Sequence, residues 1–357
     1  MRKFLALTLV IFMLVTVLAS CSNNPENLDG SSESAGDTSS SDLENGSGDN
    51  STDGGEESVG DEAPYSKSGV NVEMGSYPQK EVLDSDLIDT LNELAGDLPT
   101  VLDSMDWTSY EYYSNGSQTD YMWYIDVEEE GSMYRGVYFT SYRPAHISEY
   151  SNSDKSEQDN NSYSTETVYW FEFQPILWTV LVEDEEKALI ICESIIDAQA
   201  YDTSSNSYEG SMIREWLNKD FYETAFNEIQ QELILDTTVD NSVASTGSQN
   251  NPYSSADTED KIFLLSRAEV KDSTYGITDN STRVKAPTDY AVAQGLYKDI
   301  GNVGWWWLRS PYNDSYSVSY RIKTDGSIHS IDVGYITGGI VPALWLDLTV
   351  AESDSIE

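Results

Sequence analysis

The sequence predicts an α+β domain, because some stretches space their apolar residues as a helix does and others alternate them as a strand does. Leu91 lies four positions after Leu87 and three after Ile88, as on one face of a helix. Residues 121–127 and 342–348 instead alternate from one side chain to the next. The expected order, with helices first and short antiparallel strands at the end, is that of an α+β arrangement.

The strands follow from this alternation and from the turns that bound it. They are expected, in chain order, at residues 70–78, 121–127, 133–139, 170–182, 187–191, 261–265, 318–322 and 342–348. Gly131 and the pair Asp325–Gly326 supply hairpin turns. Pro175 lies inside the fourth strand, and because it has no amide hydrogen it favours an edge or a bulge there.

The helices follow from apolar spacing and from capping residues. Asp84 or Ser85 begins the first helix, which Gly96 limits. Ser211 begins the second, which we expect to break near Asp220.

Two shorter helices are expected later in the chain. A capping box of Ser266 and Glu269 opens one of them, and Thr288 begins the other. The polar stretches 150–165 and 237–259 are expected to be loops.

The N-terminus is typical of a secreted bacterial lipoprotein. A basic start is followed by an uncharged apolar run at residues 4–18, as in a signal peptide. Small residues then precede Cys21, which resembles a lipobox and implies cleavage before Cys21 and a lipid on its thiol. An ordinary signal peptide or a transmembrane anchor is the alternative, but the run is shorter than the roughly 20 residues that a spanning helix needs. We therefore expect residues 1–20 to be a lipoprotein signal peptide and the chain to be lipid-anchored on the extracellular face of the bacterial membrane.

The remaining chain divides by composition. Residues 21–66 are rich in Ser, Gly, Asp and Glu, and such a segment buries too little apolar surface to fold, so we expect a disordered tether. We expect an N-terminal α+β subdomain at residues 67–165, a C-terminal domain at 166–350 and a tail at 351–357.

The charge argues against two kinds of partner, nucleic acids and anionic lipid surfaces. The chain of 357 residues has 63 acidic against 19 basic side chains, which gives a net charge of −44. Nucleic acids and anionic lipid surfaces are bound through basic patches, so we expect no nucleic-acid partner and no direct docking on lipid. The charge favours solubility outside the cell.

One stretch near the C-terminus, residues 304–311, is apolar on both faces of the strand that it predicts. Trp305, Trp307 and Arg309 point one way, and the side chains between them point the other. An unpaired buried charge is very costly, so Arg309 must find a carboxylate or carbonyl groups. The stretch is either the centre of a core or the wall of a binding site, and Arg309 is either a structural ion pair or a ligand clamp.

Aromatic residues around this stretch are the main signal for ligand binding, because exposed Trp and Tyr rings pack on sugars and peptides. Trp306 and Trp307 are expected in the core. Trp305, Tyr312 and Tyr316 lie nearer the loops and are expected to be exposed. The candidate ligand-binding residues are Trp305, Arg309, Tyr312 and Tyr316.

Few residues could carry catalysis. Besides Cys21 the only cysteine is Cys192, which lies in an apolar run and is expected to be a small buried side chain. The only histidines, His146 and His329, lie in no recognisable nucleophile motif, and a zinc site is not expected. We therefore expect no catalytic residues.

Calcium is the cofactor that the sequence leaves open, because it needs only oxygen ligands. Asp236, Asp240 and Asn241 lie at loop spacings that could supply them, and Asn313 and Asp314 form a second such pair. No EF-hand pattern is present. We expect no cofactor, with calcium as the open exception.

Six pieces of the sequence together resemble the bacterial extracellular domain-of-unknown-function family numbered 6273. They are residues 75–79, 213–218, 261–266, 306–311, 325–326 and 342–346. The late Trp-Leu-Arg-Ser-Pro strand and the final hairpin are similar to the C-type-lectin-like fold of sulfatase-modifying enzymes, which implies a lectin-like domain here. Those enzymes use a pair of thiols, and a mature chain with one unlipidated cysteine is not expected to share their activity. The family tends to have an arginine where this chain has Val341.

These observations favour a non-catalytic binding or adhesion module for a glycan or peptide outside the cell. The alternative is an extracellular carbohydrate-active hydrolase with paired carboxylates, because 63 acidic residues offer pairs among which the sequence selects none. A structural wall-associated protein is the third hypothesis.

Overall fold

The computed structural model describes residues 63–100, 104–110, 122–140, 163–299, 301–335 and 338–349. Contacts divide the chain into Met1–Val59 and Gly60–Glu357, and all described residues belong to the second unit. The expected signal peptide, Cys21, nearly all of the tether, His146 and the tail lie outside the described residues. Among the described residues, no helix combines the length and the apolar character needed to cross a membrane.

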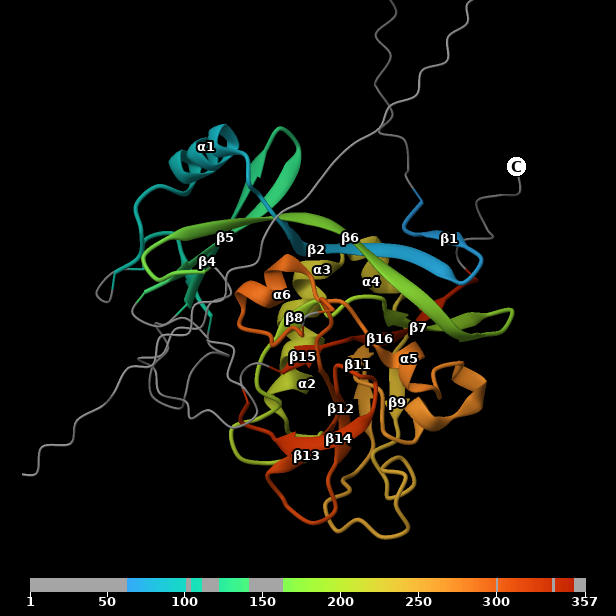
Figure 1. The fold of residues 1–357 in the computed structure, drawn as a ribbon. Coiled ribbons are helices and arrows are strands. Elements are labelled where there is room, and N and C mark those ends of the chain that lie inside the picture. The colour runs from blue at the N-terminus through green and yellow to red at the C-terminus, as the bar shows by residue number, and fades with distance from the viewer. Residues whose placement is uncertain are drawn as a thin grey trace, which may run out of the picture. The chain divides into compact units, whose positions relative to one another are not determined.

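A nine-stranded antiparallel sheet contains most of the strands (Figure 1). It consists of β1 (Ser66–Ser68), β2 (Asn71–Glu81), β3 (Thr108–Ser109), β4 (Met122–Glu129), β5 (Ser132–Phe139), β6 (Val168–Glu183), β7 (Lys187–Cys192), β11 (Ile262–Phe263) and β16 (Ala343–Asp347). The strand order is β11-β16-β7-β6-β5-β4-β3, and β2 joins β1 to β6. Because β2 and β5 pair with β6, one sheet joins the two parts expected at residues 67–165 and 166–350.

The proline in β6 lies where the strand changes neighbours. Up to Glu172 this strand pairs with β5, and from Trp178 onward it pairs with β7. Pro175 is paired only with Ser76 of β2, next to a register shift. The expected edge or bulge at Pro175 is confirmed.

Two smaller sheets complete the strands. The five-stranded sheet has the order β14-β13-β12-β15-β8, and the two-stranded sheet pairs β9 with β10. Their bounds are β8 (Asp197–Ala198), β9 (Thr237–Val239), β10 (Thr258–Asp260), β12 (Trp306–Pro311), β13 (Val318–Ile322), β14 (Ile328–Asp332) and β15 (Gly339–Ile340). The expected loop at 237–259 is therefore wrong at its ends, because β9 and β10 pair there.

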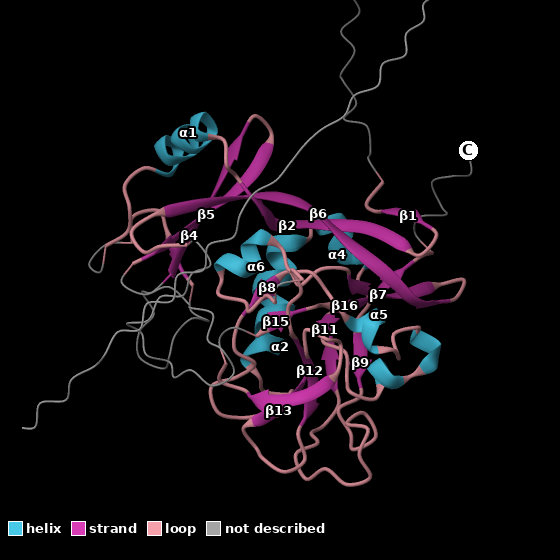
Figure 2. Ribbon diagram, in the orientation of Figure 1, coloured by secondary structure: helices cyan, strands magenta, loops and turns pink. Residues whose placement is uncertain are grey.

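The helices are short and are spread among the strands along the chain (Figure 2). They are α1 (Ser85–Ala95), α2 (Met212–Trp216), the π-helix η2 (Leu217–Phe221), α3 (Tyr222–Ala225), α4 (Glu228–Leu233), the 3₁₀-helices η3 (Glu269–Lys271) and η4 (Ser273–Tyr275), α5 (Asn280–Arg283) and α6 (Asp289–Ala293). The Asp84 side chain caps α1 by accepting from the amides of Asp86 and Leu87, as expected. The break expected near Asp220 is wrong, because η2 and α3 continue α2 directly.

The fold is α+β, as predicted, but the expected order of elements is wrong. Long strands precede most of the helices, because β2 and β4 to β7 all come before α2. The main core lies between the large sheet and the segments that follow it, with α3 and α6 against β2 (Figure 1). A smaller cluster under α1 contains Leu91, Trp107, Trp123 and Trp170.

Candidate functional site

The tryptophan stretch belongs to the core. Trp305, Trp306 and Trp307 are 4%, 1% and 0% exposed. The indole nitrogen of Trp307 donates to the carbonyl of Gln199 at 3.0 Å. The Arg321 guanidinium lies 4.7 Å from the ring of Trp305 and belongs to the neighbouring strand β13. The expected exposure of Trp305 is therefore wrong, because Arg321 packs on its ring.

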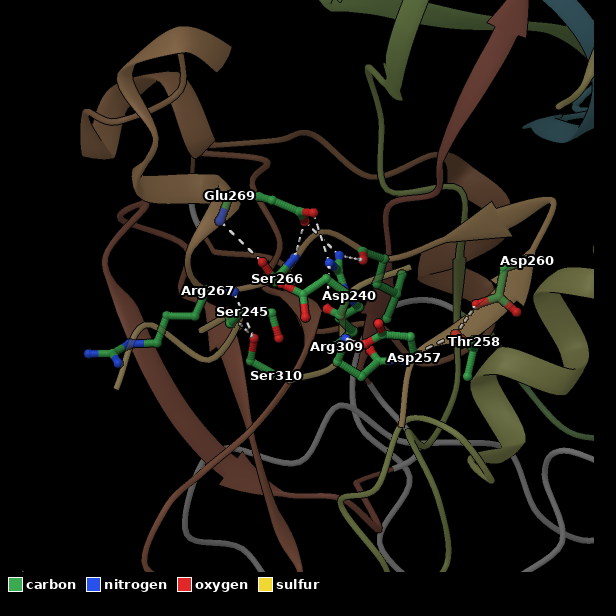
Figure 3. Close-up of polar contacts among 12 residues, drawn as sticks. Asp240, Ser245, Asp257, Thr258, Asp260, Ser266, Arg267, Glu269, Arg309 and Ser310 are labelled. Atoms are coloured by element: carbon green, nitrogen blue, oxygen red, sulfur yellow. Dashed lines mark hydrogen bonds and ion pairs between the residues drawn. The ribbon is translucent and has the colours of Figure 1, made fainter. Parts of the chain in front are cut away.

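Arg309 forms a structural ion pair, which was one of the two roles considered for it. Its side chain is 2% exposed, and two of its nitrogens donate to the two carboxylate oxygens of Glu269 at 2.5 and 2.8 Å. The same nitrogens donate to the carbonyls of Leu264 and Asp240. Figure 3 shows Arg309 beside Glu269 and Asp240. A ligand could reach this guanidinium only after the surrounding loops moved.

The polar groups around Arg309 hold several loops together (Figure 3). Ser266 and Glu269 exchange the two hydrogen bonds of a capping box, as predicted. The Ser310 hydroxyl accepts from the amide of Arg267 and donates to the carbonyl of Ser245. The polar groups of this cluster bond to one another, and these bonds stabilise the fold.

Tyr312 and Tyr316 lie in the connection between β12 and β13. The ring of Tyr312 packs edge-on against Tyr320, with 5.5 Å between the centroids, while Tyr316 is 65% exposed. The side chain of Asn206 holds this connection by donating to the carbonyls of Tyr312, Ser315 and Val318. Both tyrosines are accessible, and ligand binding by them stays a prediction.

The calcium candidates are tied into local structure. Asp240 accepts from the amide of Ser242, and the side-chain amide of Asn241 donates to Ala256 and Thr258. Among the described residues, no three Asp, Glu, His or Cys side chains are grouped closely enough to hold a metal ion. Calcium binding through other oxygen ligands stays a prediction.

Cys192 is buried in β7, as predicted. Burial raises the pKa of its thiol to about 11. His329 lies on β14 and is exposed.

A cavity of about 180 Å³ lies elsewhere, between the large sheet and the helical segment that begins with α2. Aromatic rings and charged groups share its wall: Tyr77, Tyr110, Tyr124, Trp216, Arg135 and Lys219. These residues come from β2, β4, β5, α2 and η2 and from the segment after β3. Such a mixture of apolar rings and a few placed polar groups is typical of a ligand pocket.

Arg135 of β5 is the buried cation of this cavity. Its Nε and Nη2 atoms each donate to a carboxylate oxygen of Asp126 at 2.7 Å. Its guanidinium carbon lies 4.4 Å from the ring centroid of Tyr124, close enough for a cation–π contact. Burial lowers the pKa of Arg135, but the charge and hydrogen bonds of Asp126 raise it, and the net shift is upward. The guanidinium also faces Tyr290: the Tyr290 ring centroid lies 6.0 Å from the guanidinium carbon, and hydrogen bonding to Arg135 opposes the burial that raises the pKa of Tyr290.

Asp197 of β8 orients two of the tyrosines. One of its carboxylate oxygens accepts from the hydroxyls of Tyr77 at 2.8 Å and Tyr110 at 3.4 Å. The other accepts from the amide of Ala198 at 2.6 Å. Burial raises the pKa of Asp197 to about 7, although these hydrogen bonds act in the opposite direction. Asp197 therefore holds the side chains of Tyr77 and Tyr110 in place in the wall of the cavity.

The π-helix η2 brings Lys219 to the cavity. The Asn218 side chain donates to the carbonyl of Arg214 at 3.0 Å and accepts from the amide of Ile262 at 3.1 Å. In an α-helix that carbonyl would accept from the backbone amide of residue 218 instead. Asn218 thus stabilises the wider turn, which places Trp216 and Lys219 in one wall. Such π-turns frequently occur at functional sites.

Sequence reasoning missed this cavity although signals were present. Tyr77 and Trp216 lie in two of the six pieces that carry the family resemblance, residues 75–79 and 213–218. Arg135 interrupts an apolar strand, which is the signal that singled out Arg309.

Comparison with known proteins finds a family match for only part of the chain. Residues 185–348 match the family described as Domain of unknown function (DUF6273), which supports the resemblance to that family. The match extends from just before β7 to the end of β16, so it includes Trp216 and Lys219 but neither Tyr77 nor Arg135. No curated protein and no solved structure matches the chain.

Proposed function

We propose that residues 63–349 form a non-catalytic, C-type-lectin-like binding module that holds a neutral glycan ring in the cavity beside Arg135. We also propose that a lipid on Cys21 anchors the module on the extracellular face of the bacterial membrane, with residues 22–66 as its tether.

The wall of the cavity is the observation that carries the glycan proposal. A sugar ring has apolar C–H faces that pack on aromatic rings and hydroxyls that bond to charged or polar side chains. Tyr124 and Trp216 supply the first kind of contact, while the ammonium of Lys219 supplies the second. The volume of about 180 Å³ is small for a ligand pocket, which favours a single ring over a larger ligand in this cavity.

The charges favour a neutral glycan over an acidic one. Arg135 is already paired with Asp126, and Asp220 lines the same cavity as Lys219. A chain with a net charge of −44 also repels anions at long range.

The first test is equilibrium binding of the full-length chain to glucose and N-acetylglucosamine oligomers of one to six units. We expect a dissociation constant on the order of 1 mM for one ring, because few atoms are in contact. Lys219→Ala is expected to weaken binding about tenfold, through loss of a charged hydrogen bond. The matched control is Lys298→Ala, because Lys298 is also exposed and does not line the cavity.

Three results would contradict the glycan proposal. They are the absence of binding to the whole panel, equal losses in the two lysine variants, and binding of peptides in place of sugars. Release of shortened oligomers by the wild-type chain would favour the hydrolase alternative.

The anchor is tested separately with Cys21→Ala. Without the thiol no lipid can be attached, so we expect the chain to leave the membrane fraction or to keep its signal peptide. Membrane fractionation and the mass of the N-terminal peptide measure both outcomes. Cys192→Ala is the control, because Cys192 is buried in β7. An unchanged membrane fraction for Cys21→Ala would contradict lipid anchoring.

A further inference from the structure

A second, larger depression adjoins the cavity. It has a volume of about 510 Å³. Its walls come from β2, β4, β5, β6 and the segment from α3 to α4, and they include Asp126, Met133, Phe173, Glu223, Phe226 and Asn227. We call it the Phe173 groove.

The groove and the cavity are neighbours that share part of their walls. Thr224 lines both of them. The Arg135–Asp126 ion pair stands between them, because Arg135 lines the cavity and Asp126 lines the groove. The guanidinium carbon of Arg135 also lies 5.5 Å from the ring centroid of Phe173. A ligand that reached past this ion pair would therefore contact both spaces.

Like the cavity, the groove combines apolar side chains with polar groups that can bond to a ligand. Phe173 and Met133 supply an apolar surface, and Met133 is 39% exposed. Among the described residues, neither the carboxylate of Glu223 nor the side-chain nitrogen of Asn227 has a hydrogen-bond partner. Both groups can bond to hydroxyls of a ligand.

Gly75 allows the two sides of the groove to come together. Its φ angle is +76°, in the left-handed region that glycine adopts without strain. A Cβ atom at this position would lie 2.7 Å from the Ala225 carbonyl and from the ring of Phe226. A side chain here would push the end of α3 away from β2. The groove therefore depends on glycine at the position that opens the Gly-Ser-Tyr-Pro piece.

We propose that the Phe173 groove is a second subsite, which takes the next unit of a glycan chain whose first ring fills the Arg135 cavity. The inference rests on the proposed function, and it changes the ligand from a single sugar to an extended neutral oligosaccharide.

The test compares ligand lengths in wild-type and variant chains. Glucose and N-acetylglucosamine oligomers of one to four units are titrated into the full-length chain. In the wild type we expect at least tenfold tighter binding for two or three units than for one, because a second set of contacts is added to a chain already held. Met133→Ala and Glu223→Gln are expected to remove most of this gain and to leave single-ring binding unchanged.

Controls separate the two sites from effects on folding. Met105→Ala is matched to Met133→Ala, because Met105 is 44% exposed and lines neither space. Lys219→Ala is expected to weaken short and long oligomers by the same factor. Thermal melting of each variant should stay near that of the wild type, because all four side chains are on the surface.

The outcomes distinguish the two proposals. A single ring that binds through Lys219 with no gain from longer oligomers would overturn the second subsite and leave the proposed function intact. A length-dependent gain that survives both groove variants would also overturn it, because the extra units would lie elsewhere. Absence of binding at every length would overturn both.

Discussion

Replacing Glu269 with glutamine is expected to lower the free energy of unfolding by about 3 kcal/mol, because it leaves the buried cation Arg309 without a carboxylate. Glutamine has nearly the same shape, and it can still accept the Ser266 amide in the capping box. The loss therefore comes from the charge. The Glu269 side chain is 25% exposed, and this keeps the expected loss at the lower end of the range for broken buried pairs.

A double-mutant cycle measures this coupling by denaturant unfolding. The variants are Glu269→Leu, Arg309→Met and the two together. We expect the double variant to be more stable than Glu269→Leu, because two apolar side chains leave no buried charge unpaired. The Lys67–Glu183 pair is the control, because its side chains are 28% and 46% exposed and Glu183→Ala should cost less than about 1 kcal/mol. If the losses in unfolding free energy of Glu269→Leu and Arg309→Met simply add in the double variant, the two side chains are not coupled, and this result would contradict the prediction.

The same pair shows what the sequence could and could not predict. The cost of an unpaired buried charge required a partner for Arg309, and the capping box identified Glu269 as the first-turn acid of a helix. Nothing in the sequence brought the two together, because 40 positions separate them and their contact depends on how η3 packs against β12.

Local patterns predicted most of the strands, because alternation reports which face of a sheet is buried. Local patterns failed where a residue distant in the sequence determines the burial of a side chain or the form of a helix. Trp305 is next to a loop in sequence, yet Arg321 of the adjacent strand lies on its ring. The π-turn at Asn218 depends on bonds to Ile262 of β11, so the helical pattern alone suggested a break. The cavity gathers residues from β2, β3, β4, β5, α2, η2 and α3, and single-sequence reasoning has no means of assembling them.

The buried carboxyl group beneath the cavity is expected to make stability depend on pH. Burial raises the pKa of Asp197 to about 7 in the folded chain, from a value of 3.8 when it is unperturbed. Between these values the folded chain keeps a proton that the unfolded chain releases. The contribution of Asp197 to stability is therefore fully present below about pH 4 and is lost as the pH rises toward 7. At about 1.4 kcal/mol for each unit of pKa shift, the total is on the order of 4 kcal/mol.

Asp197→Asn isolates this effect, because asparagine is neutral throughout and the other carboxylates are common to both chains. Denaturant unfolding of both chains from pH 4 to pH 8 gives the difference in their unfolding free energies. We expect the wild type to lose about 4 kcal/mol relative to the variant across this range. Asp184→Asn should leave the difference nearly constant across this range, because amide hydrogen bonds from Glu186 and Lys187 lower the pKa of Asp184 below 3.8 and its carboxylate is then charged in both states above pH 4. Parallel pH curves for wild type and Asp197→Asn would mean that the folded chain holds Asp197 charged, with Tyr77, Tyr110 and Arg135 compensating for its burial.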